Sequence, residues 1–169
     1  HDGAVYPDRP VQRGAVSPRS LVVLGVCAFA VELACAGLLG GWIGLVLYLP
    51  IVLYSLLTAV EFFARAWMSR HFTASFLIHE FLYLPLFAWV ALALGAPLDW
   101  RTAAGVAALA LLFVSVEIAR KFSPRFDPAG GVVLDTYGAV WGRSATVVVL
   151  LSLILAVGVL VFLAGGPLV

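Results

Sequence analysis

Charged residues are scarce in this sequence. Asp, Glu, Lys and Arg make up 11% of its 169 residues, whereas apolar residues make up 63% and the mean hydropathy is +1.09. Ordinary soluble domains carry about a quarter charged residues, so this composition excludes a water-soluble fold. The net charge of +1 is also too small to indicate a nucleic-acid partner, because such proteins present clustered positive charge.

The sequence also has few cysteines and lacks one motif of lipid-modifying transferases. The only cysteines, Cys27 and Cys35, lie within one apolar run, where a helix holds them too far apart for a disulfide and their spacing suits no metal site. We expect both to be small packing residues. The sequence also lacks a dense run of aspartates around a Gly-Ala-Arg element, which argues against a transferase that uses a cytidine-linked lipid donor.

The start of the chain shows no targeting signal. It begins with His1 rather than methionine, and its opening residues are polar and proline-rich, with no basic flank leading into an apolar segment. We therefore expect this chain to be part of a longer protein.

Five apolar stretches are long enough to cross a bilayer as helices, which takes about 20 residues. They are residues 21–39, 43–64, 73–95, 102–119 and 144–164. The sequence predicts an all-α integral membrane protein, with one transmembrane domain over residues 1–169 and about five helices. Pro50 and Pro85 fall inside the second and third helices and are expected to kink them.

The two long loops, residues 1–20 and 120–143, are predicted on the same side of the membrane because four helices separate them. Nine of the ten basic residues fall on that side: Arg9, Arg13, Arg19, Arg65, Arg70, Arg120, Lys121, Arg125 and Arg143. Cytoplasmic loops carry excess Lys and Arg. We therefore predict a multi-pass protein of the cell inner membrane with both loops in the cytoplasm.

Four glutamates lie in or at the edge of the predicted helices: Glu32, Glu61, Glu80 and Glu117. Carboxylates are costly inside a membrane and usually face the interior of the helix bundle. Glu61 precedes Arg65 by four residues and Glu117 precedes Lys121 by four, a spacing that predicts ion pairs on the helix surface.

Glu80 differs because no basic residue lies at helical spacing from it. It follows His79, and consecutive side chains on a helix point about 100° apart, so we expect at most one of the two to face a given site squarely. Two interpretations stay open. Either residue lines a substrate cavity, or both form hydrogen bonds between helices.

The long loops combine acidic and basic residues. The first contains Asp2 and Arg9, and the second contains Arg120, Lys121, Arg125, Asp127 and Asp135. Mg²⁺ prefers one or two carboxylates together with substrate phosphates, and arginine binds phosphate oxygens in pairs. The loops therefore predict a diphosphate site on the cytoplasmic face. The alternative is an ordinary solvated surface.

The run from Pro7 to Gly14 (PDRPVQRG), the run from Glu117 to Lys121 (EIARK) and the triplet Asp135-Thr136-Tyr137 resemble the UbiA superfamily of membrane prenyltransferases. The dense DxxxD spacing of that family is found in neither loop. The resemblance implies a nine-helix bundle of which this chain supplies helices three to seven. It also implies two missing helices before His1 and about two after Val169.

The resemblance further implies Mg²⁺-dependent transfer of an isoprenyl group from an allylic diphosphate to a lipophilic or aromatic acceptor within the membrane, among its lipids. It assigns Asp2, Asp127 and Asp135 as metal ligands, and Arg9, Arg120, Lys121 and Arg125 as diphosphate ligands. Tyr137 would act with Asp2 and Asp127 in catalysis, and His79, Glu80 and Glu117 would line the substrate cavity. Without the missing helices, we expect this chain alone to be inactive.

The alternative function is a non-enzymatic multi-pass membrane protein, either part of a transporter or an assembly subunit. Its intramembrane glutamates would then serve ion passage or helix packing.

Overall fold

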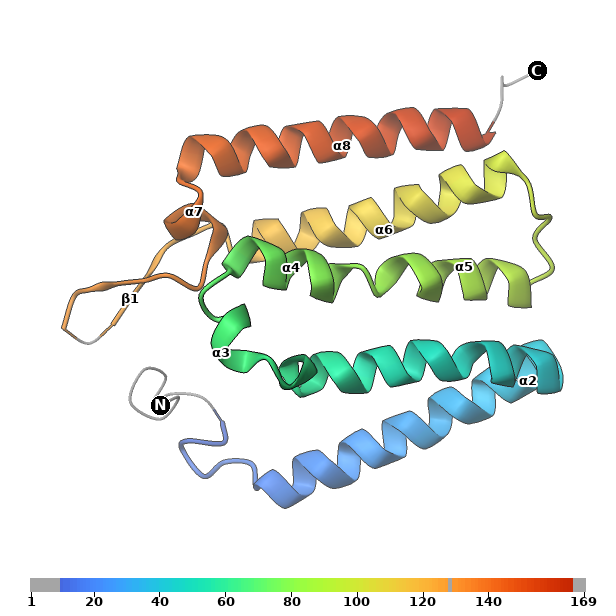
Figure 1. The fold of residues 1–169 in the computed structure, drawn as a ribbon, viewed down its shortest axis with the longest axis horizontal. Helices are drawn as coiled ribbons and strands as arrows, with labels where there is room; N and C mark the ends of the chain where they lie inside the picture. Colours follow the sequence, from blue (N-terminus) through green and yellow to red (C-terminus); the bar gives the residue numbers. More distant parts are fainter. Residues whose placement is uncertain (1–9, 128, 166–169) are drawn as a thin grey trace.

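The protein is a bundle of helices in a computed structural model that describes residues 10–127 and 129–165 (Figure 1). Asp2 and Arg9 lie outside the described residues. Within the described residues, four helical stretches are long and apolar enough to cross a membrane, namely α2 (Pro18–Ala59), the pair α4 (Phe72–Glu80) and α5 (Tyr83–Ala93), α6 (Trp100–Arg120) and α8 (Arg143–Gly165). This architecture fits the predicted all-α class and a multi-pass membrane protein.

The 42-residue helix α2 is bent at Gly41, and its two limbs run in opposite directions (Figure 1). The sequence predicted these limbs as separate helices over 21–39 and 43–64. Gly41 has φ 59° and ψ −157°, a backbone conformation that is essentially restricted to glycine because it brings a Cβ atom too close to the backbone. The first limb begins after Ser17, whose Oγ accepts a hydrogen bond from the Ser20 amide at 3.0 Å.

The second limb ends at Ala59, five residues earlier than predicted. The cause is η1 (Glu61–Phe63), in which three consecutive residues have positive φ angles of 51°, 49° and 57°. This left-handed turn leads the chain into the short helix α3 (Arg65–Met68). Pro50, which the sequence predicted as a kink, lies inside α2 without interrupting its helical dihedral angles.

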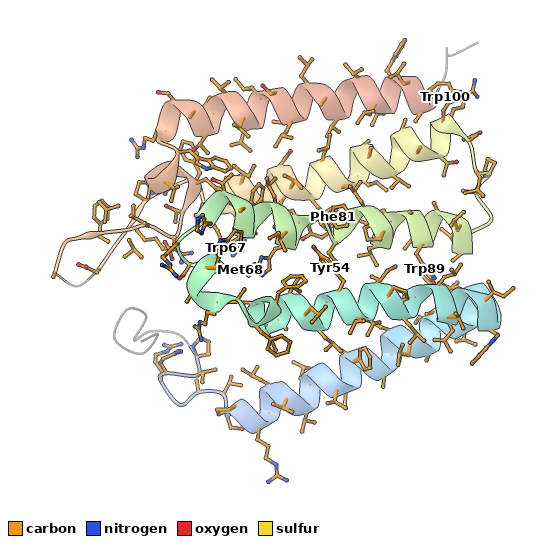
Figure 2. All side chains as sticks on the ribbon, in the orientation of Figure 1. Tyr54, Trp67, Met68, Phe81, Trp89 and Trp100 are labelled. Atoms are coloured by element: carbon orange, nitrogen blue, oxygen red, sulfur yellow. The ribbon has the colours of Figure 1, made fainter. Side chains whose placement is uncertain are left out.

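The third predicted helix is broken into α4 and α5 at Phe81 and Leu82. Pro85 explains the position of the break, since a proline has no N–H and its ring crowds the carbonyl four residues earlier, here that of Phe81. Figure 2 shows Phe81 about midway between the two ends of the bundle. The kink expected at Pro85 is therefore a local interruption of the helix, directly after Glu80.

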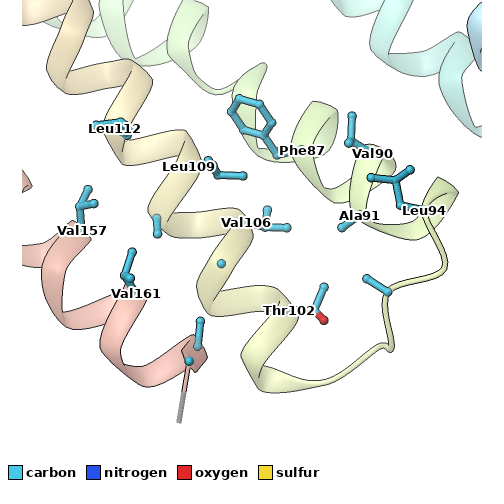
Figure 3. A pocket seen from close by; sticks show the side chains of 15 residues that line it. Phe87, Val90, Ala91, Leu94, Thr102, Val106, Leu109, Leu112, Val157 and Val161 are labelled. Carbon is cyan, nitrogen blue, oxygen red and sulfur yellow. The ribbon is translucent and has the colours of Figure 1, made fainter. Parts of the chain in front are cut away.

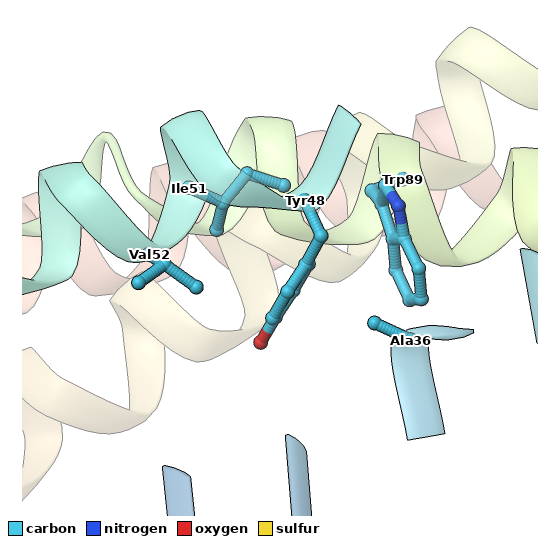
Figure 4. Close-up of a cluster of buried hydrophobic side chains, with 5 residues drawn as sticks. All are labelled: Ala36, Tyr48, Ile51, Val52 and Trp89. Carbon is cyan, nitrogen blue, oxygen red and sulfur yellow. The ribbon is translucent and has the colours of Figure 1, made fainter. Parts of the chain in front are cut away.

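A cluster of buried side chains joins the two limbs of α2 to α5 (Figure 4). Trp89 of α5 packs against Tyr48, with 4.8 Å between ring centroids, and its Nε1–H donates to the carbonyl oxygen of Gly44 at 2.8 Å. Ala36 of the first limb is 1% exposed beside them. The α2 bend is thus held closed by an aromatic side chain from another helix.

The loop between α6 and α8 contains structure that the sequence did not predict. Two short strands, β1 (Arg125–Phe126) and β2 (Val132–Val133), pair antiparallel and are followed by α7 (Tyr137–Val140). This loop, α3 and the start of α4 gather at one end of the bundle, while the Gly41 bend and the α5–α6 turn lie at the other (Figure 1). The end that holds α3 and the α6–α8 loop carries Arg65, Arg70, Arg120, Lys121, Arg125 and Arg143, whereas Arg101 lies at the other end, as the sequence predicted.

Asp99 is the charged residue that begins α6 at the opposite end. Its Oδ1 accepts a hydrogen bond from the Thr102 amide at 2.8 Å, which lowers the pKa of the carboxyl group. A helix N-terminus favours such a negatively charged cap. The side chain of Arg101 follows and lies over the ring of Trp100, 5.6 Å from its centroid.

We predict that Gly41→Ala destabilises the protein by about 1–3 kcal/mol, because alanine is strained at this φ and ψ. Gly40→Ala is the matched control. A Cβ at Gly40 would meet Trp89 at an ordinary 3.8 Å, and alanine is favoured over glycine within a helix. Unfolding of both variants in detergent, followed by circular dichroism, should rank Gly41→Ala well below the control. Equal stabilities would contradict the role given to Gly41.

Candidate functional site

A polar cavity of about 240 Å³ lies between α4, α6 and α7 at the basic end of the bundle. Its lining combines aromatic, hydroxyl, carboxylate and ammonium groups. The residues are Phe72, Ser75, Phe76, His79, Glu80, Glu117, Lys121 and Tyr137. The structure therefore brings together five of the residues that the sequence singled out, namely His79, Glu80, Glu117, Lys121 and Tyr137.

His79 and Glu80 both line this cavity, although their helical spacing predicted that at most one would face a given site. The cavity lies along one face of α4, which contributes residues from its first turn to its last. A helix face more than 100° wide accommodates two consecutive residues at its end, so the expectation that at most one would face the site was wrong. The Nδ1 atom of His79 lies 2.7 Å from the carbonyl oxygen of Ser75. A hydrogen bond there requires the proton on Nδ1.

Glu80 carries an orphaned oxygen. Its Oε2 atom is buried and has no hydrogen-bond partner among the described residues. Leaving a buried polar atom unsatisfied typically costs about 1–3 kcal/mol, and more for a charged group. The cavity thus contains a strong hydrogen-bond acceptor that no described residue satisfies.

Glu117, by contrast, is fully engaged. Its Oε2 accepts from the guanidinium of Arg120 at 2.7 and 2.9 Å, and its Oε1 lies 2.8 Å from the ammonium group of Lys121. The predicted pair with Lys121 is confirmed, as is the pair of Glu61 with Arg65 at 3.7 Å. Two candidate diphosphate ligands are therefore held at the mouth of the cavity by one carboxylate.

Tyr137 forms a buried wall of the cavity and is 2% exposed. Its ring makes edge-on contacts with Phe72 and Phe76, with centroids 5.1 and 5.0 Å apart, and burial raises the pKa of its hydroxyl. The following residue is glycine because a Cβ at Gly138 would collide with the carbonyl oxygen of Phe122. This close approach presses α7 against the end of α6.

Trp141 helps to build the site, although the sequence analysis did not single it out. Its Nε1–H donates to the hydroxyl of Thr73 at 2.8 Å, and its ring contacts Tyr137 with centroids 4.8 Å apart. It thereby ties the α6–α8 loop to α4. No local pattern could have revealed this bond, since its partners are 68 residues apart.

Asp127 and Asp135 lie in the β-hairpin loop and do not line the cavity. Asp127 Oδ1 accepts from the amides of Ala129 and Gly131 at 2.9 and 2.7 Å, which shapes the hairpin turn. Asp135 Oδ2 lies 3.3 Å from the guanidinium of Arg125. Both predicted metal ligands therefore have structural roles in the loop, where their carboxylates engage backbone amides and a cation.

The described residues do not fit a magnesium site built from converging carboxylates. Within residues 10–127 and 129–165, no group of three His, Cys, Asp or Glu side chains gathers closely enough to hold a metal ion. Glu80 and Glu117 share the cavity, but Arg120 and Lys121 already neutralise Glu117. The predicted ligand Asp2 lies outside the described residues, as does the predicted diphosphate ligand Arg9.

An apolar groove begins one residue beyond the polar cavity. Its first part, about 560 Å³, runs between α5 and α6 from Phe81 past Pro85 to Thr102. A second hollow of about 660 Å³ lies between α5, α6 and α8 and is lined almost entirely by aliphatic side chains (Figure 3). The break in the helix therefore places a polar cavity on its Glu80 side and an apolar groove on its Phe81 side.

No protein family model, curated protein or solved structure matches this chain. Its function is therefore inferred from the chemistry of the cavity and of the groove beside it.

We predict opposite effects for two buried threonines near the site, both of which are 0% exposed. The Thr136 hydroxyl has no partner among the described residues, whereas that of Thr146 donates to the Gly142 carbonyl at 2.9 Å. Thr136→Val should stabilise the protein by about 1 kcal/mol because it removes an unsatisfied hydroxyl. Thr146→Val should destabilise it by about 1 kcal/mol because it removes an existing hydrogen bond.

Denaturation of the two valine variants side by side in detergent checks this prediction. A loss of stability in Thr136→Val as large as that in Thr146→Val would show that the Thr136 hydroxyl is satisfied.

Proposed function

We propose that this protein is a membrane-embedded transferase that moves an isoprenyl group from an allylic diphosphate to an acceptor. One observation carries the proposal: at the break in the α4–α5 stretch, Glu80 lines a polar cavity and the next residue, Phe81, lines an apolar groove. A substrate with its hydrocarbon tail in the groove would place its polar head at the basic end of the bundle, beside the cavity. The resemblance of the loops to the UbiA superfamily points to the same substrate class.

The hydrocarbon tail would lie in the groove between α5 and α6. Most of its lining side chains, including Leu84, Ala88 and Leu92, are apolar, and burial of a chain there would be favoured by about 0.8 kcal/mol for each CH₂ group. Leu84 and Leu92 are exposed at the bundle surface, where a tail would enter from the bilayer. This explains why such an enzyme would be embedded in the membrane.

The diphosphate would bind at the basic end, to Arg120, Lys121 and Arg125. Arginine presents paired N–H donors to phosphate oxygens, and the Arg120 side chain is 61% exposed. Lys121 lines the cavity itself. These cations would stabilise the negative charge that grows on the diphosphate as its bond to the allylic carbon breaks. By the positive-inside rule, this end faces the cytoplasm of a cell inner membrane.

Mg²⁺ is implied by the resemblance to UbiA prenyltransferases, but the described carboxylates do not converge on a site for it. The steps proposed for this chain therefore use its own side chains only.

A second candidate function is that of an assembly subunit without enzymatic activity. It is favoured by Glu32, which is exposed on the first limb of α2 within an apolar span and accepts a long hydrogen bond of 3.5 Å from the Tyr48 hydroxyl. A carboxylate at such a position is costly in lipid. A partner helix with a hydrogen-bond donor would relieve that cost.

The proposed function predicts that the chain, in nanodiscs of zwitterionic lipid, binds a non-hydrolysable thio-analogue of farnesyl diphosphate. Lys121→Gln should weaken this binding at least tenfold, or about 1.4 kcal/mol, because it removes the cation that lines the cavity. Arg101→Gln, which removes a cation at the opposite end of the bundle, is the matched control and should leave the affinity unchanged. Calorimetry with and without Mg²⁺ provides the measurement.

Two further comparisons sharpen the result. Farnesol, which lacks the diphosphate, should bind Lys121→Gln and the unmodified chain equally. Asp127→Asn keeps an oxygen for the hairpin amides but removes the charge, so a loss confined to Mg²⁺-containing buffer would assign Asp127 to the metal. Absence of diphosphate-dependent binding to the unmodified chain would exclude the transferase and favour the assembly subunit.

A further inference from the structure

The cavity lacks a hydrogen-bond donor for the Oε2 atom of Glu80. Oε2 is a buried acceptor with no donor in residues 10–127 and 129–165, in a space bounded by α4, α6 and α7. Every other charged group that lines the space is already paired with a neighbour, since the Glu117 oxygens are occupied by Arg120 and Lys121. A ligand that supplies one hydrogen-bond donor at Glu80 would complete the site.

The charges around Glu80 limit the charge of that ligand. Glu117 and Lys121 face it from α6 and its C-terminal end, His79 faces it from its own helix, and the Tyr137 ring faces it from α7. Together with Arg120, these groups place two carboxylates against two permanent cations. A neutral donor leaves this balance intact, whereas an anionic group beside Glu80 would meet a like charge, which is destabilising at close range.

The size and walls of the cavity limit the ligand further. An apolar cavity of about 150 Å³ is known to hold benzene, so about 240 Å³ admits a group the size of one substituted ring. Phe72 and Phe76 supply flat apolar walls, and the hydroxyl of Ser75 is beside them. A cavity of this size would not hold a substituted ring together with a hydrated ion.

From these observations we infer that Glu80 binds an uncharged hydroxyl or amino group on the molecule that enters the cavity and selects against a carboxylate at that position. If the proposed transferase function holds, that molecule is the acceptor. The bond between the allylic carbon and the diphosphate oxygen breaks, and its electron pair leaves with the diphosphate. The acceptor atom bonds to the carbon, and the proton that the acceptor loses passes to the Glu80 carboxylate.

Three single-ring probes of similar size test the selectivity without any diphosphate. para-Cresol carries a neutral donor, para-methylanisole carries the same oxygen without a donor, and para-toluate carries an anion. Ligand-observed NMR with the chain in nanodiscs should show para-cresol binding at least tenfold more tightly than either other probe, a ratio that corresponds to about 1.4 kcal/mol.

Two variants connect that selectivity to Glu80. Glu80→Leu should bring para-cresol and para-methylanisole to within about threefold of each other, since hydrogen bonds to charged groups contribute roughly 1.5–3 kcal/mol. Glu80→Gln keeps an acceptor oxygen but removes the charge, so it should keep part of the para-cresol preference and raise the affinity for para-toluate at least threefold. Glu61→Gln, at a glutamate of the η1 turn, is the matched control and should retain the original ranking.

Equal binding of para-cresol and para-methylanisole by the unmodified chain would overturn the inference, as would an unchanged affinity for para-toluate in Glu80→Gln. The Glu80→Gln result decides the matter even if Glu80→Leu does not fold. Because these probes carry no diphosphate, failure here would leave the farnesyl analogue result standing, and failure of that analogue would leave the role of Glu80 as a donor-binding residue intact.

Discussion

The molecule is organised by the need to satisfy backbone hydrogen bonds inside lipid. Water cannot serve the peptide groups within a bilayer, so spanning segments adopt helices and irregular backbone is tolerated only beside protein or a cavity. In this chain the irregular segments follow that rule. The Gly41 bend and the η1 turn lie at the ends of the bundle, and the break at Phe81 and Leu82 lies between a polar cavity and an apolar groove. The candidate site thus depends on one interrupted helix.

The polar cavity is assembled by contacts between distant parts of the chain. The bond from Trp141 to Thr73 holds the α6–α8 loop against α4, and the close approach at Gly138 presses α7 onto the end of α6. These contacts bring Tyr137 into the same cavity as Glu80 and Glu117. The ion pairs of Glu117 with Arg120 and Lys121 then fix two cations at the mouth. The Oε2 atom of Glu80 still lacks a hydrogen-bond donor among the described residues.

The proposed division of labour separates the two ends of an amphiphilic substrate. Tail binding would depend on the apolar lining between α5 and α6, and diphosphate binding would depend on the cations at the basic end. The Glu80 oxygen would bind the acceptor. The loop aspartates have partners within the loop, because Asp127 accepts from the amides of its own hairpin and Asp135 pairs with Arg125; their role as metal ligands stays a prediction. Their carboxylates organise the loop that carries the basic residues.

The sequence by itself determined the membrane class, the approximate helices, the gathering of basic residues at one end and the ion pairs of Glu61 and Glu117. These features follow from composition, hydrophobic length and helical spacing, which are local properties. Only the tertiary structure decided that His79 and Glu80 share one cavity, that Trp141 bonds to Thr73, and that Asp127 and Asp135 belong to a hairpin. The shared cavity requires α6 and α7 to pack against α4, the Trp141 bond joins residues 68 positions apart, and the hairpin depends on a turn. Helical periodicity carries no information about these contacts.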